Sequence, residues 1–226
     1  LELMKISFPI LFSLFTLPIF SQNQDFVKPD YALIEKNVKD KDSPYHFKKL
    51  FSRYAKADTT MTLEEKRHLY YGYSFQDEYE PYERATPHKD LNEILAKDLT
   101  KSDYEKILIH SANILKEYPF SVRMKEYRIF SYKELGMHKE AENETVQASM
   151  ILDAILSSGD GTTKEKSFYV INTMNEYEII YILGFEFDGQ QELISHQYDY
   201  LTVSENSYNL KGLYFEVSRS LSTLKF

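Results

Sequence analysis

Residues 118–156, YPFSVRMKEYRIFSYKELGMHKEAENETVQASMILDAIL, decide the fold because they contain two helical patterns joined by a single glycine. The pair Tyr118-Pro119 ends the helix before them, since the residue before a proline disfavours the α conformation. The spacing predicts one helix over 120–135, and Gly136 stands where helices commonly end in a left-handed residue. A second helix follows, with small and apolar residues along one side. That side carries Ala141, Thr145, Ala148, Leu152 and Ile155.

Local signals extend the helical part over about 30–182. Residues 43–44 (Ser-Pro) predict a helix start, with serine as the cap and proline in the first turn. Residues 62–65 (Thr-Leu-Glu-Glu) form a capping box, and residues 100–103 give a second capping signal. The acidic and aromatic stretch 74–87 lacks helical periodicity, so we expect an irregular loop there.

Residues 157–161 (SSGDG) interrupt the helical pattern. Thr162 or Thr163 is then suitable as the cap of a further helix. The apolar side of this predicted helix contains Phe168, Ile171, Met174 and Tyr177.

The period changes from helical to alternating after Gly184. Asp188-Gly189 lies between two apolar-patterned runs, which is a strong signal for a hairpin turn. On the next strand Tyr198, Tyr200 and Thr202 alternate with Asp199, Leu201 and Val203, and His196 is predicted on the tyrosine side. A third strand alternates Leu213, Phe215 and Val217 with Tyr214, Glu216 and Ser218.

The first 22 residues resemble a secretory signal peptide. Lys5 precedes an apolar run from Ile6 to Phe20, and a polar stretch follows. This run is shorter than the ~20 apolar residues of a membrane-spanning helix. The chain contains no cysteine to which a lipid could be attached. We therefore expect an exported protein, periplasmic or secreted, that is neither an integral membrane protein nor a lipoprotein.

The formal net charge of −8 argues against binding to nucleic acid, which requires clustered lysine and arginine. The six histidines are scattered, and no pair has the three- or four-residue spacing of a helical metal site. No nucleophile motif or paired-carboxylate spacing is present either. The sequence thus predicts no catalytic residue, no metal and no cofactor, although it does not exclude an enzyme.

Several polar and aromatic residues are nevertheless candidates for binding a ligand. Tyrosines beside an arginine and a histidine could stack on and hydrogen-bond a ligand, but half-buried structural tyrosines give the same pattern. Asp160 lies in a glycine-rich loop, which a helix stop at Gly159 followed by a cap at Thr162 or Thr163 explains better than a phosphate-binding loop. The candidate residues are Arg67, His68, Tyr70, Tyr71, Asp160 and His196.

The central helix pair resembles a tetratricopeptide repeat. The resemblance rests on a proline, an aromatic residue, a turn glycine and two small residues, namely Pro119, Tyr132, Gly136, Ala141 and Ala148. It implies two antiparallel helices that approach closely at the small residues. The predicted fold is therefore α+β and predominantly α, with tetratricopeptide-like helical hairpins followed by a small antiparallel β-meander over about 183–218. We expect one domain over 23–226.

Taken whole, the chain resembles an uncharacterised family of exported proteins of the Bacteroidetes type, domain of unknown function 4919. The matching stretches are DTTMT (58–62), RHLYYGY (67–73), YPF (118–120), SSGDG (157–161), YDYL (198–201) and GLYF (212–215). The resemblance implies no activity and assigns no residue a role. We hypothesise a non-enzymatic module that binds a protein or peptide through the helix-pair groove and aromatic surfaces. The alternative is a small-molecule binder (of a sugar, peptide or lipid) or hydrolase, with a pocket between helices and meander around His68, Tyr71 and Asp160.

Overall fold

The predicted central helix pair is present in the computed structural model, which describes residues 25–81 and 86–223. Helix α6 spans Val122–Glu134 and α7 spans His138–Leu156. Gly136, with φ of +75°, makes the turn between them. Its N–H donates to the Lys133 carbonyl, and the Met137 N–H donates to the Tyr132 carbonyl at 2.8 Å. These two bonds form a Schellman motif, which is why the helix ends here.

The other predicted capping signals lie at helix starts as expected. Helix α3 (Leu63–Gly72) begins with the Thr62–Glu65 capping box, in which each side chain accepts from the other residue's backbone N–H. Helix α5 (Lys101–Glu117) begins with the equivalent box of Thr100 and Asp103. Three other helical segments lie before α5, namely α1 (Tyr31–Lys39), α2 (Phe47–Ala55) and α4 (Thr86–Leu95), and a 3-10 turn, η1 (Tyr73–Phe75), follows α3.

Two predicted boundaries in this region need correction. Ser43-Pro44 does not start a helix, because α2 begins only at Phe47. The Ser43 hydroxyl instead accepts the Tyr45 N–H at 3.0 Å and closes a turn. The loop expected up to Pro87 ends earlier, since α4 starts at Thr86 and contains this proline in its first turn.

The prediction of a helix that begins at Thr162 or Thr163 is wrong for the first half of that segment. Helix α8 spans only Met174–Ile182, and Phe168–Tyr169 forms a short strand, β1. The N–H groups of Asp160 and Gly161 both donate to the Lys166 carbonyl and close a loop before that strand. The apolar run 168–171 that follows is buried on both sides. Periodicity alone does not distinguish such a continuous apolar run from a helix.

The sheet has four strands in the order β1-β4-β3-β2, rather than the predicted three. Strands β2 (Phe187–Ile194), β3 (Tyr198–Val203) and β4 (Gly212–Glu216) are antiparallel neighbours, as predicted. Strand β1 joins β4 in parallel, so the sheet is mixed. The alternation predicted for β3 is confirmed, with Asp199, Leu201 and Val203 as its buried residues.

Asp188-Gly189 is not the hairpin turn. It lies inside β2, where Phe187 opposes Val203 and Gln191 opposes Leu201, so four steps along β2 match two along β3. This is a bulge, which Gly189 accommodates with φ of +88°. The turn is made by Ser195 and His196, both with positive φ, because burial of β3 against the core fixes the register. His196 therefore lies in the turn and not on the tyrosine face.

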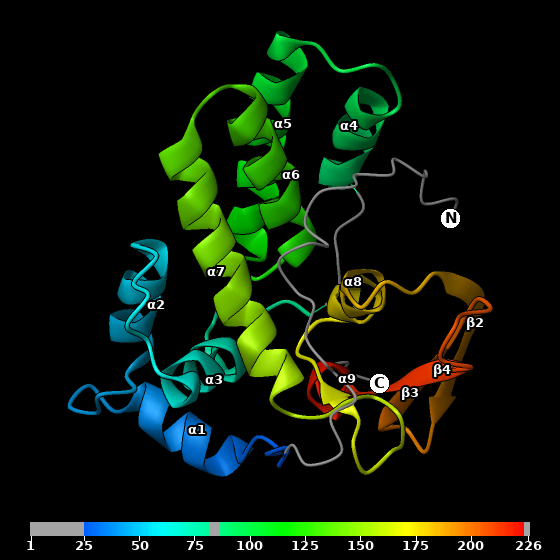
Figure 1. Cartoon of the computed structure of the whole chain (residues 1–226). Coiled ribbons are helices and arrows are strands. Elements are labelled where there is room, and N and C mark those ends of the chain that lie inside the picture. Colours follow the sequence, from blue (N-terminus) through cyan, green and yellow to red (C-terminus); the bar gives the residue numbers. More distant parts are fainter. Residues whose placement is uncertain (1–24, 82–85, 224–226) are drawn as a thin grey trace.

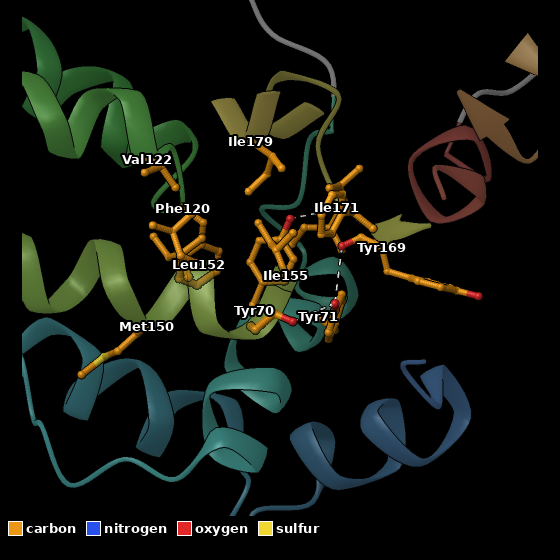
Figure 2. Packing of buried hydrophobic residues seen from close by; sticks show 14 of the residues in the cluster. Tyr70, Tyr71, Phe120, Val122, Met150, Leu152, Ile155, Tyr169, Ile171 and Ile179 are labelled. Carbon is orange, nitrogen blue, oxygen red and sulfur yellow. Dashed lines mark hydrogen bonds between the residues drawn. The ribbon is translucent and has the colours of Figure 1, made fainter. Parts of the chain in front are cut away.

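Helix α7 lies at the centre of the molecule, between α2 and α3 on one side and α6 on the other (Figure 1). Its buried side packs with α3 and β1 in the main hydrophobic core (Figure 2). The fully buried aromatic rings of this core include Tyr70, Tyr71, Phe120, Phe168 and Phe215. A second cluster joins α4, α5 and α6 through Leu91, Leu95, Ile107, Ile114 and Met124.

The fold is thus α+β and predominantly α, with the sheet at the C-terminal end of the chain. None of the helices in the described ranges combines the length and the apolar character needed to cross a bilayer. The predicted signal peptide, 1–22, lies outside the described residues, and the extent of the single domain stays a prediction.

Candidate functional site

The four candidate residues of α3 are all buried, with exposed fractions of 4% or less. Tyr70 donates to Asn175 Oδ1 at 2.7 Å and accepts the Ile171 N–H at 3.2 Å. The Tyr71 hydroxyl donates to the Ala154 carbonyl at 3.1 Å. Both hydroxyls therefore serve the packing of α3 against α7, α8 and the chain just before α8.

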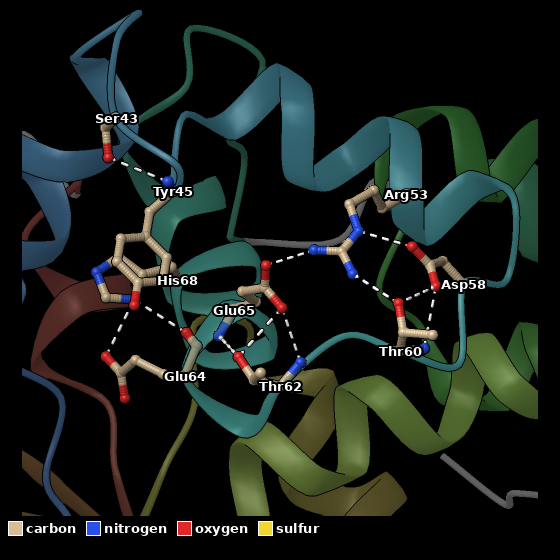
Figure 3. A network of polar contacts seen from close by, with 9 residues as sticks. All are labelled: Ser43, Tyr45, Arg53, Asp58, Thr60, Thr62, Glu64, Glu65 and His68. Carbon is tan, nitrogen blue, oxygen red and sulfur yellow. Dashed lines mark hydrogen bonds and ion pairs between the residues drawn. The ribbon is translucent and has the colours of Figure 1, made fainter.

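Arg67 and His68 are likewise held by the protein itself. Arg67 donates to Ser157 Oγ at 2.6 Å, and its guanidinium lies over the Tyr71 ring. The His68 ring stacks on Tyr45 with centroids 4.1 Å apart (Figure 3). Its Nδ1 lies 3.0 Å from the Glu64 carbonyl, which can only accept, so Nδ1 carries the proton. Nε2 then accepts from the Asn37 amide at 2.9 Å.

Asp160 and His196 lie elsewhere. The Asp160 carboxylate accepts the N–H and hydroxyl of Thr162, at 2.9 and 2.6 Å, and so shapes its own loop. His196 is exposed in the β2–β3 turn. Within residues 25–81 and 86–223, no hydrogen bond joins His68, Tyr71 and Asp160 to one another, and each of the three has partners of its own.

A polar network fixes the stretch DTTMT (58–62) between α2 and α3 (Figure 3). Arg53 donates from Nε to Asp58 at 2.7 Å, from Nη2 to Thr60 at 3.0 Å, and from Nη1 to Glu65. Hydrogen bonds from Thr60 and Arg53 lower the pKa of Asp58 to about 2. The arginine thus clamps the loop to the start of α3, which is a structural role.

A second network, which the sequence did not suggest, is centred on Glu178 of α8. Its carboxylate accepts the backbone N–H groups of Val122 and Arg123, at 3.1 and 2.9 Å, and the Ser121 hydroxyl at 2.7 Å. A carboxylate at this place satisfies the free N–H groups at the start of α6 and favours its dipole. Asn175 completes the network by donating to Glu178 at 2.6 Å.

Two further acids meet beneath the sheet. Glu176 of α8 is fully buried, and beside it lies Asp199 of β3, 6% exposed. Burial raises the pKa of both groups, and for Glu176 the Asp199 carboxylate raises it further. Gln191 of β2 donates to Asp199 at 2.7 Å and accepts from Tyr177 at 2.7 Å. The pair is shielded from solvent, so it does not form an open catalytic site.

The opposite face of the sheet carries tyrosines. Tyr198, Tyr200 and Tyr214 are half-buried, and the rings of the last two lie 4.6 Å apart. Gly212 makes room for them, because a Cβ there would come within 2.5 Å of the Tyr200 ring. The alternation of β3 predicted the common face of Tyr198 and Tyr200, whereas the partnership with Tyr214 depends on pairing with β4.

One edge of the sheet is formed by β2. It pairs with β3 on one side, and within the described chain no strand pairs with its other side. Residues 188–193 are all exposed, including Leu193 at 45%. No group of three or more acidic or histidine side chains in the described ranges is placed to hold a metal ion.

A family model described as "Domain of unknown function (DUF4919)" matches residues 32–225. The chain belongs to this family. No curated protein and no solved structure matches the DUF4919 chain. The tetratricopeptide likeness of its α6–α7 pair stays a prediction, as does an origin in bacteria of the Bacteroidetes type.

Proposed function

We propose that this DUF4919 protein is an exported, non-enzymatic interaction module that binds an extended, basic segment of a partner protein along β2. The observation that carries the proposal is the open edge of the sheet. Strand β2 has eight residues, and its outer backbone N–H and C=O groups face no strand of the described chain. Such an edge is a template for strand addition by a peptide.

Charge selects the kind of segment. Asp188 and Glu192 are exposed on β2, and Glu186 is exposed just before it. These carboxylates disfavour pairing of β2 with a second copy of itself and favour a strand with lysine or arginine opposite them. The net charge of −8 also attracts a basic partner to the protein.

The helix-pair groove, which the sequence first suggested, is a weaker candidate because α2 covers part of it. Gln147 of α7 donates to the Ala55 carbonyl at 3.2 Å. Lys125 of α6 lies over the Tyr54 ring, with its Nζ 5.5 Å from the centroid. These residues of α6 and α7 already contact the chain's own α2, whereas β2 is exposed.

Fluorescence anisotropy with three sets of decapeptides tests the binding mode. All sets alternate an apolar residue with a second residue, which is lysine, serine or glutamate. We expect the lysine set to bind tightest and to weaken with salt, because exposed charges are screened. Amide hydrogen exchange should slow in β2 on binding. Equal binding of the glutamate set, or binding without protection of β2, would contradict the proposal.

Charge reversal provides the matched comparison. Asp188→Lys with Glu192→Lys should weaken binding of the lysine set about tenfold or more, which corresponds to about 1.4 kcal/mol. Glu105→Lys with Glu117→Lys changes two exposed acids of α5 and alters the net charge equally. This control should leave the affinity within about a factor of two, since long-range charge effects are screened. An equal loss in both double variants would indicate a general charge effect.

Export rests on the pattern of residues 1–22 and has its own test. Residues 1–30 fused to a reporter that is active only outside the cytoplasm should give activity. Leu14→Arg interrupts the apolar run and should abolish that activity. A reporter that stays inactive with the unaltered leader would refute export by this segment.

A further inference from the structure

Glu216 lies between two tyrosines on the outer face of the sheet. In the ladder it pairs with Tyr198 of β3 and with Tyr169 of β1, so the three side chains form one row. Neighbours in such a row have Cβ atoms about 5 Å apart. Glu216 is 2% exposed and Tyr169 is 8% exposed, whereas Tyr198 is half-buried at the solvent side.

Only one oxygen of the Glu216 carboxylate has a partner. Oε1 accepts from the Ser218 hydroxyl and from Gln197 Nε2 at 3.3 Å. Oε2 is buried and is reached by no donor of the described chain. A buried carboxylate oxygen without a donor is costly, and such atoms usually mark a missing partner.

Tyr31 of α1 adds a second unpartnered group. Its hydroxyl is buried and makes no hydrogen bond within residues 25–81 and 86–223. Its ring stands edge-on to Tyr71, with centroids 5.9 Å apart. Besides burial, the Glu216 charge raises the pKa of the hydroxyls of Tyr31, Tyr71, Tyr169 and Tyr198. In the sheet the carboxylate is flanked by Tyr169 and Tyr198.

We propose that Glu216, Tyr169 and Tyr198 bind a primary ammonium group, from a lysine side chain, a chain N-terminus or a free amine. Aromatic rings around a carboxylate attract an organic cation through their negative faces, and the carboxylate neutralises it. The free Oε2 additionally needs an N–H donor, which an ammonium group supplies. A quaternary ammonium lacks N–H groups and fits this site less well.

Lys28 distinguishes a ligand site from a purely structural cluster. It is exposed in the segment before α1, and its charge opposes the rise in the Glu216 pKa that burial causes. A bound cation would be repelled by it. Removing that charge should therefore strengthen binding of an ammonium ligand, which a purely structural cluster does not predict.

Isothermal titration of the full chain at pH 8 tests the site with n-butylammonium, which stays protonated there as a lysine does. Tetramethylammonium and n-butanol are the controls for charge without N–H groups and for the alkyl chain alone. We expect saturable binding of n-butylammonium and at least tenfold weaker binding of both controls. A lysine amide with its α-amine acetylated and a glycine amide then compare side-chain and N-terminal sources.

Glu216→Gln keeps the shape and removes the charge, so it should weaken n-butylammonium binding at least tenfold. Lys28→Gln, at the surface, should strengthen it about twofold, as expected for an exposed charge. Circular dichroism and thermal unfolding verify that both variants fold. Equal binding of tetramethylammonium, unchanged affinity in folded Glu216→Gln, or no saturable binding to the unaltered chain would overturn the proposal.

Glu216 lies on β4, two strands away from β2 in the sheet, so the two proposals are separable. Asp188→Lys with Glu192→Lys should leave n-butylammonium binding within about a factor of two, because distant exposed charges are screened. If this double variant loses peptide binding and keeps amine binding, the two sites are independent. If it loses both, they are not independent.

Discussion

The carboxyl group of Glu176 on α8 lies beside that of Asp199 on β3, and burial together with the Asp199 carboxylate raises the pKa of Glu176. No hydrogen-bond donor of the described chain reaches either oxygen of Glu176. Two adjacent carboxylates cannot both ionise in a buried place, so the pair retains one proton well above the ordinary pKa. The helix–sheet contact therefore depends on pH.

Stability should fall as the pH rises from 5 to 8. The pKa of Glu176 is raised in the folded state, so its contribution is complete below the unfolded value of about 4.3 and is lost as the pH passes the folded pKa. Glu176→Gln removes the titrating carboxyl group and should flatten this dependence. Urea unfolding at pH 5 and 8 measures both slopes. Glu140→Gln, which changes an exposed acid of α7, is the control, and identical slopes in all three proteins would refute the raised pKa of Glu176.

Glu126 of α6 should titrate near neutrality. Burial raises its pKa from 4.5 to about 7, although Arg123, at 3.8 Å, opposes the shift. The difference corresponds to about 3 kcal/mol of stability that is present at pH 4 and lost by pH 8. Carbon NMR of the side-chain carboxyl group measures the pKa directly, with Glu140 as the exposed reference. A midpoint below 5 would show that Glu126 is solvated.

Removing Glu178 should be among the most damaging single changes. Glu178→Ala leaves the N–H groups of Val122 and Arg123 and the Asn175 amide without their acceptor. We expect a loss of about 3–5 kcal/mol, as for other broken buried polar networks. Glu178→Gln retains one acceptor and should lose less. Equilibrium urea unfolding compares them, and similar losses from both changes would mean that the charge rather than the acceptor is essential.

Two glycines should differ in their tolerance of alanine. At Gly159 a Cβ would come within 2.2 Å of the Lys166 carbonyl oxygen, so Gly159→Ala must open the loop before β1. At Gly136 a Cβ meets nothing within 4 Å, and only the positive φ resists alanine. We expect a loss above about 2 kcal/mol for the first change and about 1 kcal/mol for the second. Thermal unfolding that ranks them in the opposite order would disprove the close approach.

Features determined within a few residues were predictable from the sequence. The capping box at Thr62, the second box at Thr100 and the turn at Gly136 all lie where their local chemistry placed them. The alternation of β3 was also predictable, because one of its faces is buried. These signals do not depend on how distant parts of the chain meet.

Features determined by distant contacts were not predictable. Phe168 is a strand residue because β4, far along the chain, supplies its partner Phe215. Asp188-Gly189 forms a bulge because the buried side of β3 fixes the register. The candidate residues of α3 were identified by residue type, but burial assigns their polar atoms to internal bonds. The unpartnered oxygen of Glu216 was not predictable either, because its surroundings depend on the pairing of β4 with both β1 and β3.

The place of β4 in the sheet has a consequence for biosynthesis. Strand β1 pairs with β4, which lies between β1 and β3 in the sheet. Along the chain, however, β3 is synthesised before β4. The segment at 168–169 therefore waits for 215–216 before it can be ordered by that ladder. A nascent chain therefore cannot complete this sheet until residues 215–216 have been made.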